Sequence, residues 1–114
     1  MKHLDKLCKQ IVADMEDGRC YVCGREGTDL AHLFVRNKLA TRWDVAEDGN
    51  CHILCRECHD KDHRGLEVYS EAYIRKNGLM AYNDLRLRSN QMIVNVKAFI
   101  AKKEWELNDA YNRK

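Results

Sequence analysis

The sequence predicts an α+β domain in which a short ββα unit is flanked by helices on both sides. Apolar residues recur at helical spacing near both ends of the chain, and its 114 residues contain no proline. Between these ends lie two Cys-x2-Cys pairs, separated by segments with strand and turn character. The length suits a single domain, which we divide into an N-terminal helix (1–18), a central core (19–65) and a helical extension (66–114).

The N-terminal and central elements follow from local patterns. Residues 4–16 have apolar side chains on one helical face, and Asp17-Gly18 ends this helix. Residues 29–35 and 51–55 are the expected strands, with a turn at 48–50 between them. The composition becomes helical from Arg56 onward.

Beyond Gly65 we expect only helices. They cover residues 69–77, ended by Gly78 as a C-terminal cap, then residues 79–88 and a helix within 91–111. The last helix carries an apolar stripe whose members are Ile93, Val96, Ile100 and Leu107, with Phe99 beside it. We interpret the stripe as part of the chain's own core; the alternative is a surface for a partner or a dimer mate.

The four paired cysteines predict a structural zinc site. Cys20 and Cys23 form one Cys-x2-Cys pair, and Cys55 and Cys58 form the other. Such pairs in a reducing compartment favour metal over disulfides, and four cysteine ligands leave no open position for water. The two further cysteines, Cys8 and Cys51, are expected to be small buried residues. Of the two, Cys51 is the better candidate for an additional metal ligand, because it lies only four residues before Cys55.

Charge and hydropathy narrow the functional classes. A net charge of +2 does not by itself indicate nucleic acid, but residues 33–43 hold Arg36, Lys38 and Arg42 without an acidic residue. This basic stripe is our candidate for phosphate contact; the alternative is a solvated loop. The sequence has no signal-peptide pattern and no apolar run near the ~20 residues of a membrane span, so we expect a cytoplasmic protein.

The central residues resemble the HNH, or ββα-metal, endonuclease family. The family pattern Cys-x2-Cys-Gly … His … Asn-x3-Leu-Cys-x2-Cys-His is matched by Cys20, Cys23, Gly24, His32, Asn50, Leu54, Cys55, Cys58 and His59. Residues 32–36, 41–44 and 50–52 are further similar to NinG/Rap-type recombination nucleases of lambdoid phages. The resemblance covers residues 19–64 and implies a treble-clef-like core.

The resemblance implies a role for each polar residue. His32 would be the general base that activates water, and Asn50 would fix its orientation. His59, with His63 one helical turn later, would hold a catalytic Mg²⁺ or Mn²⁺ ion on the scissile phosphate. Arg36 or Arg42 would brace that phosphate.

The chain departs from the family immediately before the proposed base. Most HNH enzymes have Asp or His there as a metal ligand, whereas this chain has Ala31. We expect the metal to use Asp29, His52, or more water and phosphate oxygens instead. His52 itself is interpreted first as a structural histidine, and Trp43 as a core residue.

The leading hypothesis is therefore a metal-dependent endonuclease that hydrolyses DNA phosphodiester bonds, with branched DNA in phage recombination or replication as the implied setting. A homodimer would suit cutting of both strands, although nothing in the chain requires one. One alternative is a non-catalytic zinc module that binds nucleic acid. It would keep the four cysteines and the Arg36–Arg42 stripe, while His59 and His63 would hold no metal. Separate structural alternatives are that His32 is a hydrogen-bonded core histidine, Asn50 a turn residue and His63 an exposed helix residue. A third hypothesis is a helical protein-interaction domain.

Overall fold

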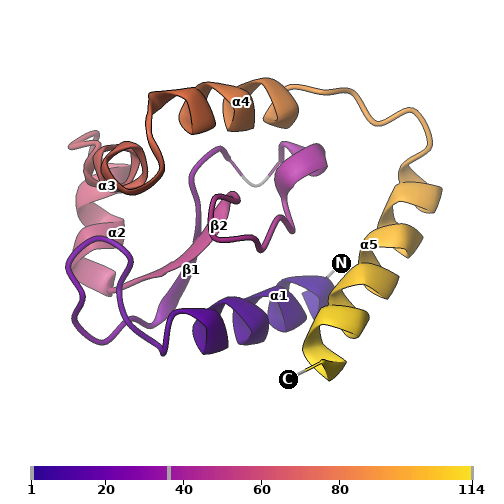
Figure 1. Ribbon diagram of the computed structural model, residues 1–114, viewed down its shortest axis with the longest axis horizontal. Coiled ribbons are helices and arrows are strands. Elements are labelled where there is room, and N and C mark those ends of the chain that lie inside the picture. The colour runs from indigo at the N-terminus through magenta and orange to yellow at the C-terminus, as the bar shows by residue number, and fades with distance from the viewer. Residues whose placement is uncertain (1, 36, 114) are drawn as a thin grey trace.

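The computed structural model describes residues 2–35 and 37–113; Arg36 lies outside this range. The elements follow the predicted order (Figure 1). They are α1 (Lys2–Met15), β1 (Asp29–His32), the 3₁₀ turn η1 (Leu39–Thr41), β2 (Cys51–Leu54), α2 (Arg56–His63), α3 (Val68–Asn77), α4 (Leu79–Ser89) and α5 (Val96–Asn112). The described residues thus form an α+β fold, as the sequence predicts.

The two strands form an antiparallel hairpin near the centre of the molecule (Figure 1). Its register pairs Ala31 with His52 and His32 with Cys51. Because side chains alternate along a strand, Ala31 and His52 lie on one face, whereas His32 and Cys51 lie on the other. The hairpin therefore has two distinct faces, and consecutive residues of the predicted site point to opposite sides.

Helices cover both faces of this hairpin. The face toward α1 and α5 contributes Cys51 and Ile53 to one apolar cluster, whose other buried members are Leu4, Cys8, Ile11, Val12, Trp43 and Leu107. The opposite face contributes Ala31 and Leu54 to a second cluster, which is completed by Cys20, Tyr21, Cys58, Tyr69, Ala72, Tyr73 and Leu85. All four residues of β2 are buried as a result.

Strand β1 is shorter than the predicted 29–35, and Asn50 is the reason. The Asn50 side chain accepts a hydrogen bond from the Phe34 amide at 2.7 Å and donates to the Phe34 carbonyl at 2.9 Å. These bonds occupy the backbone groups that a longer strand would offer to β2. The strand consequently ends at His32.

A partly buried ion pair joins α1 to the segment that precedes β2. Arg42 donates to both carboxylate oxygens of Asp5, at 3.2 and 2.8 Å, and the Trp43 indole donates to Asp5 Oδ1 at 2.8 Å. The Arg42 and Asp5 side chains are 13% and 23% exposed, so this pair is partly shielded from solvent. It fixes Trp43 in the core, as the sequence analysis expects of that residue.

The C-terminal helices agree with the predicted boundaries except at α5. Gly78, with φ of +92°, separates α3 from α4 in a conformation that favours glycine. Helix α5 begins at Val96 because Asn95 caps it, accepting from the Ala98 amide at 3.0 Å. Only part of the predicted stripe is core: Leu107 is buried, and Phe99 and Ile100 pack beside it, whereas Val96 is 46% exposed.

None of the helices in residues 2–35 and 37–113 is sufficiently long and apolar to cross a membrane.

Asp5 provides a test of the tie between α1 and the central core. Asp5→Ala is expected to lower the free energy of unfolding by about 2–4 kcal/mol, because it leaves the Arg42 charge without its shielded partner. Urea denaturation measures this loss. Asp84→Ala removes an exposed ion pair with Arg88 and is the matched control, with an expected change of less than about 0.5 kcal/mol. Equal losses in the two variants would contradict the assigned role of Asp5.

Candidate functional site

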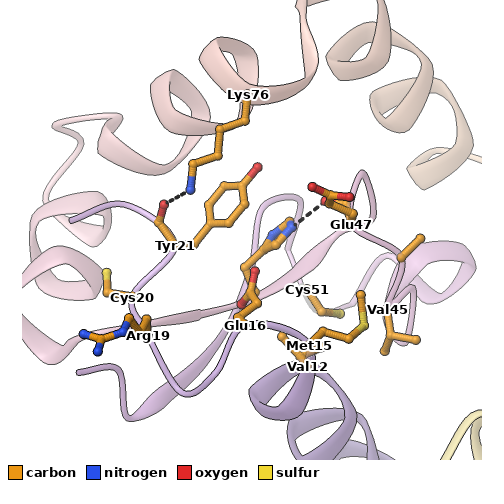
Figure 2. Close-up of a pocket in the computed structure, with 12 residues that line it drawn as sticks. Val12, Met15, Glu16, Arg19, Cys20, Tyr21, Val45, Glu47, Cys51 and Lys76 are labelled. Carbon is orange, nitrogen blue, oxygen red and sulfur yellow. Dashed lines mark hydrogen bonds between the residues drawn. The ribbon is translucent and has the colours of Figure 1, made fainter. Parts of the chain in front are cut away.

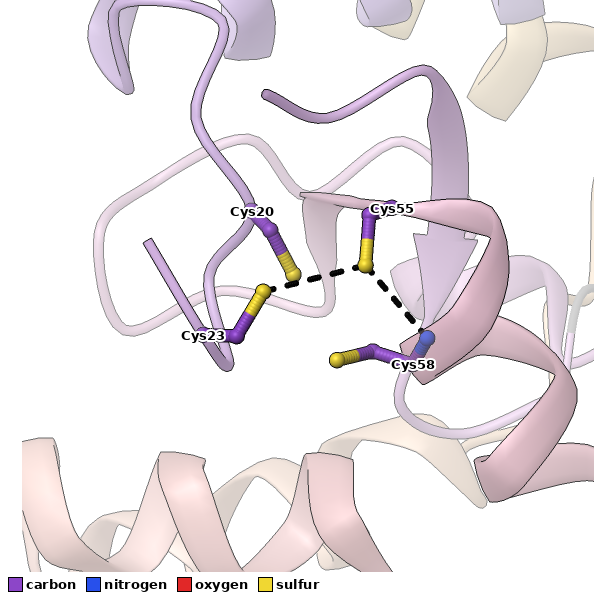
Figure 3. Close-up of side chains that lie close together, drawn as sticks. All are labelled: Cys20, Cys23, Cys55 and Cys58. Atoms are coloured by element: carbon purple, nitrogen blue, oxygen red, sulfur yellow. Dashed lines mark hydrogen bonds between the residues drawn. The ribbon is translucent and has the colours of Figure 1, made fainter. Parts of the chain in front are cut away.

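The four paired cysteines come together at one end of the hairpin (Figure 3). Their Sγ atoms all lie within 4.8 Å of one another, and the Cys23 and Cys55 sulfurs are 3.7 Å apart. A tetrahedral zinc ion with Zn–S bonds of about 2.3 Å would place its sulfurs roughly 3.8 Å apart. The cluster therefore fits a structural metal ion such as zinc.

Local backbone structure holds each cysteine pair. The first pair lies in a tight turn, closed by the hydrogen bond from the Gly24 amide to the Cys20 carbonyl at 2.9 Å. Gly24 has φ of +79°, which explains the glycine directly after Cys23. The second pair is the first turn of α2, where Cys55 is the N-cap and its sulfur accepts from the Cys58 amide at 3.4 Å.

Arg25 favours the thiolate form of one ligand. Its Nε donates to the Cys23 sulfur at 3.5 Å, and this bond lowers the pKa of Cys23 to about 6. The same guanidinium is paired with Glu57 at 2.9 Å. Because metals bind the thiolate, this environment prepares Cys23 for coordination.

The other two cysteines behave as small core residues, as the sequence predicts. Cys8 and Cys51 are 0% and 1% exposed and lie outside the four-sulfur group. The hydrogen bond with Cys8, together with burial, raises the pKa of Cys51 well above its usual value. Cys51 is therefore a neutral thiol, and its sulfur bonds to the Arg42 carbonyl at 3.1 Å.

Three histidines from the sequence analysis line one cavity of about 270 Å³. His32 contributes from the end of β1, and His59 and His63 contribute from α2; the other lining residues are Leu30, Ala31, Val35, Asp62 and Tyr69. Residues from both faces of β1 take part, so the cavity follows the strand edge that β2 leaves unpaired. We call this cavity the histidine cleft.

The hydrogen bond of His32 defines its tautomer. Its Nε2 lies 2.9 Å from the Arg42 carbonyl oxygen, which can only accept. The proton of a neutral His32 ring must therefore be on Nε2, and the basic lone pair is on Nδ1. The ring is half-buried, and its hydrogen bond with the Arg42 carbonyl limits its rotation.

His59 is oriented by a carboxylate. Its Nδ1 donates to Asp29 Oδ2 at 2.9 Å, which leaves Nε2 as the nitrogen with a lone pair. Burial raises the pKa of Asp29, but hydrogen bonds from His59, Thr28 and Arg56 outweigh it and hold this pKa below the usual value. Asp29 is therefore a carboxylate at neutral pH.

His63 lies beside His59, one helical turn along α2. The two ring centroids are 4.4 Å apart and the rings meet edge to face. The His63 side chain is exposed, so it forms the outer wall of the histidine cleft. No set of three His, Cys, Asp or Glu ligand atoms in the described part of the chain is as tightly grouped as the four sulfurs. A metal held at His59 and His63 would therefore depend on water or substrate oxygens for its remaining ligands.

Asn50 is fully buried, and its side chain forms hydrogen bonds with backbone groups rather than with the His32 ring. Besides Phe34, it donates to the Thr41 carbonyl at 3.2 Å. It thereby joins the residues just after His32 to those just before Arg42, whose carbonyl holds the His32 ring. The connection between Asn50 and His32 through these bonds therefore runs along the backbone.

The two arginines proposed as phosphate contacts have different outcomes. Arg36 lies outside the described residues. Arg42 is committed to Asp5 through two hydrogen bonds, a contact that the sequence analysis did not anticipate. The partners are 37 positions apart in the sequence, so no local pattern signals the pair.

His52 is a structural residue in the core, as first interpreted. Its Nδ1 is 2.7 Å from the Tyr69 hydroxyl, its Nε2 is 3.1 Å from the Glu47 carbonyl, and its ring stacks on Tyr21. Burial lowers the pKa of His52 to about 4, so the ring is neutral at physiological pH. Both nitrogens are occupied, so His52 does not replace the ligand missing at Ala31.

A second cavity, of about 490 Å³, lies between α1, β2 and α3 (Figure 2). Glu16 and Lys76 line it together with His52, and Lys76 donates to the Tyr21 carbonyl. The Glu16 carboxylate accepts from the Ile53 amide at 2.7 Å, while burial raises the pKa of Glu16 to about 7. No sequence signal singles out Glu16, because a lone acid near a helix end carries no distinguishing pattern.

No protein family model, curated protein or solved structure matches this chain in comparisons with known proteins.

The four-sulfur cluster predicts a metal requirement for folding. Cys20→Ser and Cys58→Ser are each expected to abolish zinc binding and to unfold the central core, because metal binding there is coupled to folding. Elemental analysis and circular dichroism measure the two effects. Cys8→Ala, a buried cysteine outside the cluster, is the control and should keep its zinc. An unchanged melting temperature in the two serine variants would contradict a structural metal.

Glu16 predicts a pH dependence of stability. Because its pKa in the folded protein, about 7, lies above the ordinary value of 4.5, the native state binds this proton more tightly than the unfolded state does. The resulting stabilisation is full below pH 4.5 and is lost as the pH rises through about 7. Glu16→Gln keeps an acceptor for the Ile53 amide and should weaken this dependence in melting curves between pH 5 and 8. Glu71→Gln, at an exposed position on α3, should leave it unchanged.

Proposed function

We propose that the chain is a metal-dependent endonuclease of the ββα-metal type that hydrolyses DNA phosphodiester bonds. The observation that carries this proposal is the histidine cleft, which brings His32 of the hairpin together with His59 and His63 of α2. A base and a pair of metal-binding imidazoles on one cavity are the groups that phosphodiester hydrolysis needs. The four-sulfur cluster holds the strand and the helix that carry them.

The sulfur cluster has a structural role in this proposal, with zinc as its ion. All four positions are cysteines, so a tetrahedral ion there has no place for a substrate or for a reactive water. Its contribution is to fix the start of α2 against the hairpin. The position of α2 against the hairpin in turn directs His59, one residue after Cys58, toward the histidine cleft.

His32 is the proposed general base. With its proton on Nε2 and that proton held by the Arg42 carbonyl, Nδ1 is the atom that accepts a proton from the attacking water. The imidazolium that forms keeps the same carbonyl contact. Asn50 supports this geometry, because it joins the chain on both sides of the loop through Phe34 and Thr41.

His59 and His63 are the proposed protein ligands of the catalytic ion. A divalent ion such as Mg²⁺ or Mn²⁺, when bound, supplies a Lewis acid for the phosphate and its leaving oxygen. Asp29 accepts a hydrogen bond from Nδ1 of His59, which fixes the ring and leaves Nε2 as the nitrogen that can bind a metal ion. Asp29 lies two residues before Ala31 on the same face of β1, and in this proposal it orients a ligand instead of being one.

His32→Ala tests the proposal directly. Wild-type protein incubated with supercoiled plasmid and Mg²⁺ or Mn²⁺ should produce nicked DNA, and a four-way junction tests the implied preference for branched DNA. Loss of the base should lower the cleavage rate by about 10²–10⁴-fold, while the zinc content stays unchanged. His3→Ala, an exposed histidine at the start of α1, is the matched control and should cut like wild type.

The other outcomes separate the remaining hypotheses. Equal cutting by wild type and His32→Ala would point to a contaminating nuclease and would contradict the assignment of the base. DNA binding without cutting by either protein would favour a non-catalytic zinc module. Absence of both activities would leave the helical protein-interaction domain as the remaining hypothesis.

A further inference from the structure

A further cavity, distinct from the one beside Glu16, adjoins the histidine cleft on the side of α1; we call it the lysine hollow. It has a volume of about 320 Å³ and is lined by Asp5, Lys6 and Lys9 of α1 together with Leu30 and His32 of β1. Leu30 and His32 also line the histidine cleft, so the two hollows share a wall. Any chain-like ligand that lies across His32 would therefore reach both.

The charges at this hollow favour an anion. Asp5, its acidic residue, is compensated by two hydrogen bonds from Arg42 and a third from Trp43. Lys6 and Lys9 are exposed, and neither forms an ion pair within residues 2–35 and 37–113. The two ammonium groups thus provide uncompensated positive charge beside the proposed base.

Arg42 cannot contact a DNA phosphate while its guanidinium is paired with Asp5, so another cation near His32 has to do so. A polynucleotide needs cationic contacts on the phosphates next to the one that reacts, since these contacts position the strand. A lysine suits this task because its flexible stem carries a compact charge that does not require a fixed geometry. Three residues apart on one helix, Lys6 and Lys9 lie on neighbouring positions of the same face.

We propose that Lys6 and Lys9 bind backbone phosphates of DNA next to the phosphate held in the histidine cleft, so that α1 is part of the nucleic-acid interface. This inference rests on the proposed function for its choice of ligand. The DNA strand would run from α2, across His32, to α1. The contact is electrostatic and independent of base sequence, because the hollow offers two ammonium groups.

Binding measurements under non-cleaving conditions test the proposal. Fluorescence anisotropy of a labelled DNA duplex is measured with the zinc-loaded full chain, without added Mg²⁺ or Mn²⁺, over a range of salt concentrations. Lys6→Ala/Lys9→Ala should weaken binding by at least tenfold near 0.1 M salt and should reduce the slope of log K against log salt by about 2. Lys6→Arg/Lys9→Arg should restore both, since it keeps the charges.

The matched control is Lys97→Ala/Lys102→Ala, which removes two exposed lysines of α5 that line neither hollow. It should bind like wild type, apart from a small uniform effect of net charge. If both double variants lose the same affinity and slope, or if neither does, the proposal is overturned. Failure of the wild-type chain to bind the duplex would overturn it as well.

This result is separable from the test of the nuclease. If the Lys6/Lys9 variant loses binding but the wild-type protein never cuts DNA, the interface stands and the enzymatic proposal falls. If wild type cuts and the variant cuts with unchanged KM and kcat, the nuclease stands and the α1 interface falls. A raised KM with nearly unchanged kcat supports both, because it indicates lost substrate binding without a lost catalytic group.

Discussion

The contact between the two cysteine pairs is the constraint on which the rest of the structure depends. A two-stranded hairpin is marginally stable alone, and here its strands have only four residues each. The sulfurs of Cys20 and Cys23 meet those of Cys55 and Cys58 beyond one end of the hairpin, so one cluster joins the first turn, β2 and α2. A metal ion at this point would remove the repulsion between thiolates and convert these three weak local elements into one rigid unit.

Period-two alternation explains how such a small sheet can support a site. Ala31 and Asp29 face α2, while His32 faces α1, yet all three are within one short strand. A cavity along the edge of β1 can therefore collect side chains from both faces. The same alternation makes β2 a shared wall of the two apolar clusters, so packing on one side limits movement on the other.

Much of this architecture could be predicted from local sequence signals. Helical periodicity predicted α1, and Gly78 as a cap within an all-helical region predicted α3 and α4 to within one residue. The Cys-x2-Cys spacing predicted the sulfur cluster. Contacts between distant residues could not be predicted in this way. Arg42, a predicted phosphate contact, forms an ion pair with Asp5 of α1, and Asn50 ends β1 early by bonding to Phe34. The grouping of His32 with His59 and His63 was expected from the resemblance to HNH endonucleases. The hollow beside Lys6 depends instead on how α1 packs against β1, and no sequence motif indicates that contact.

Helix α5 is attached in an unusual way. It packs on α1 through Phe99, Ile100 and Leu107, but the segment that leads into it exposes Met92 by 91% and Val94 by 99%. An endoprotease needs an accessible extended stretch, and this segment offers one between two helices. Cleavage there would leave α5 bound as a separate peptide, held by its apolar contacts and by the ion pair between His3 and Glu104. Such a cut would leave the backbone of the hairpin, of the sulfur cluster and of both hollows intact, since all of them are formed by residues before this segment.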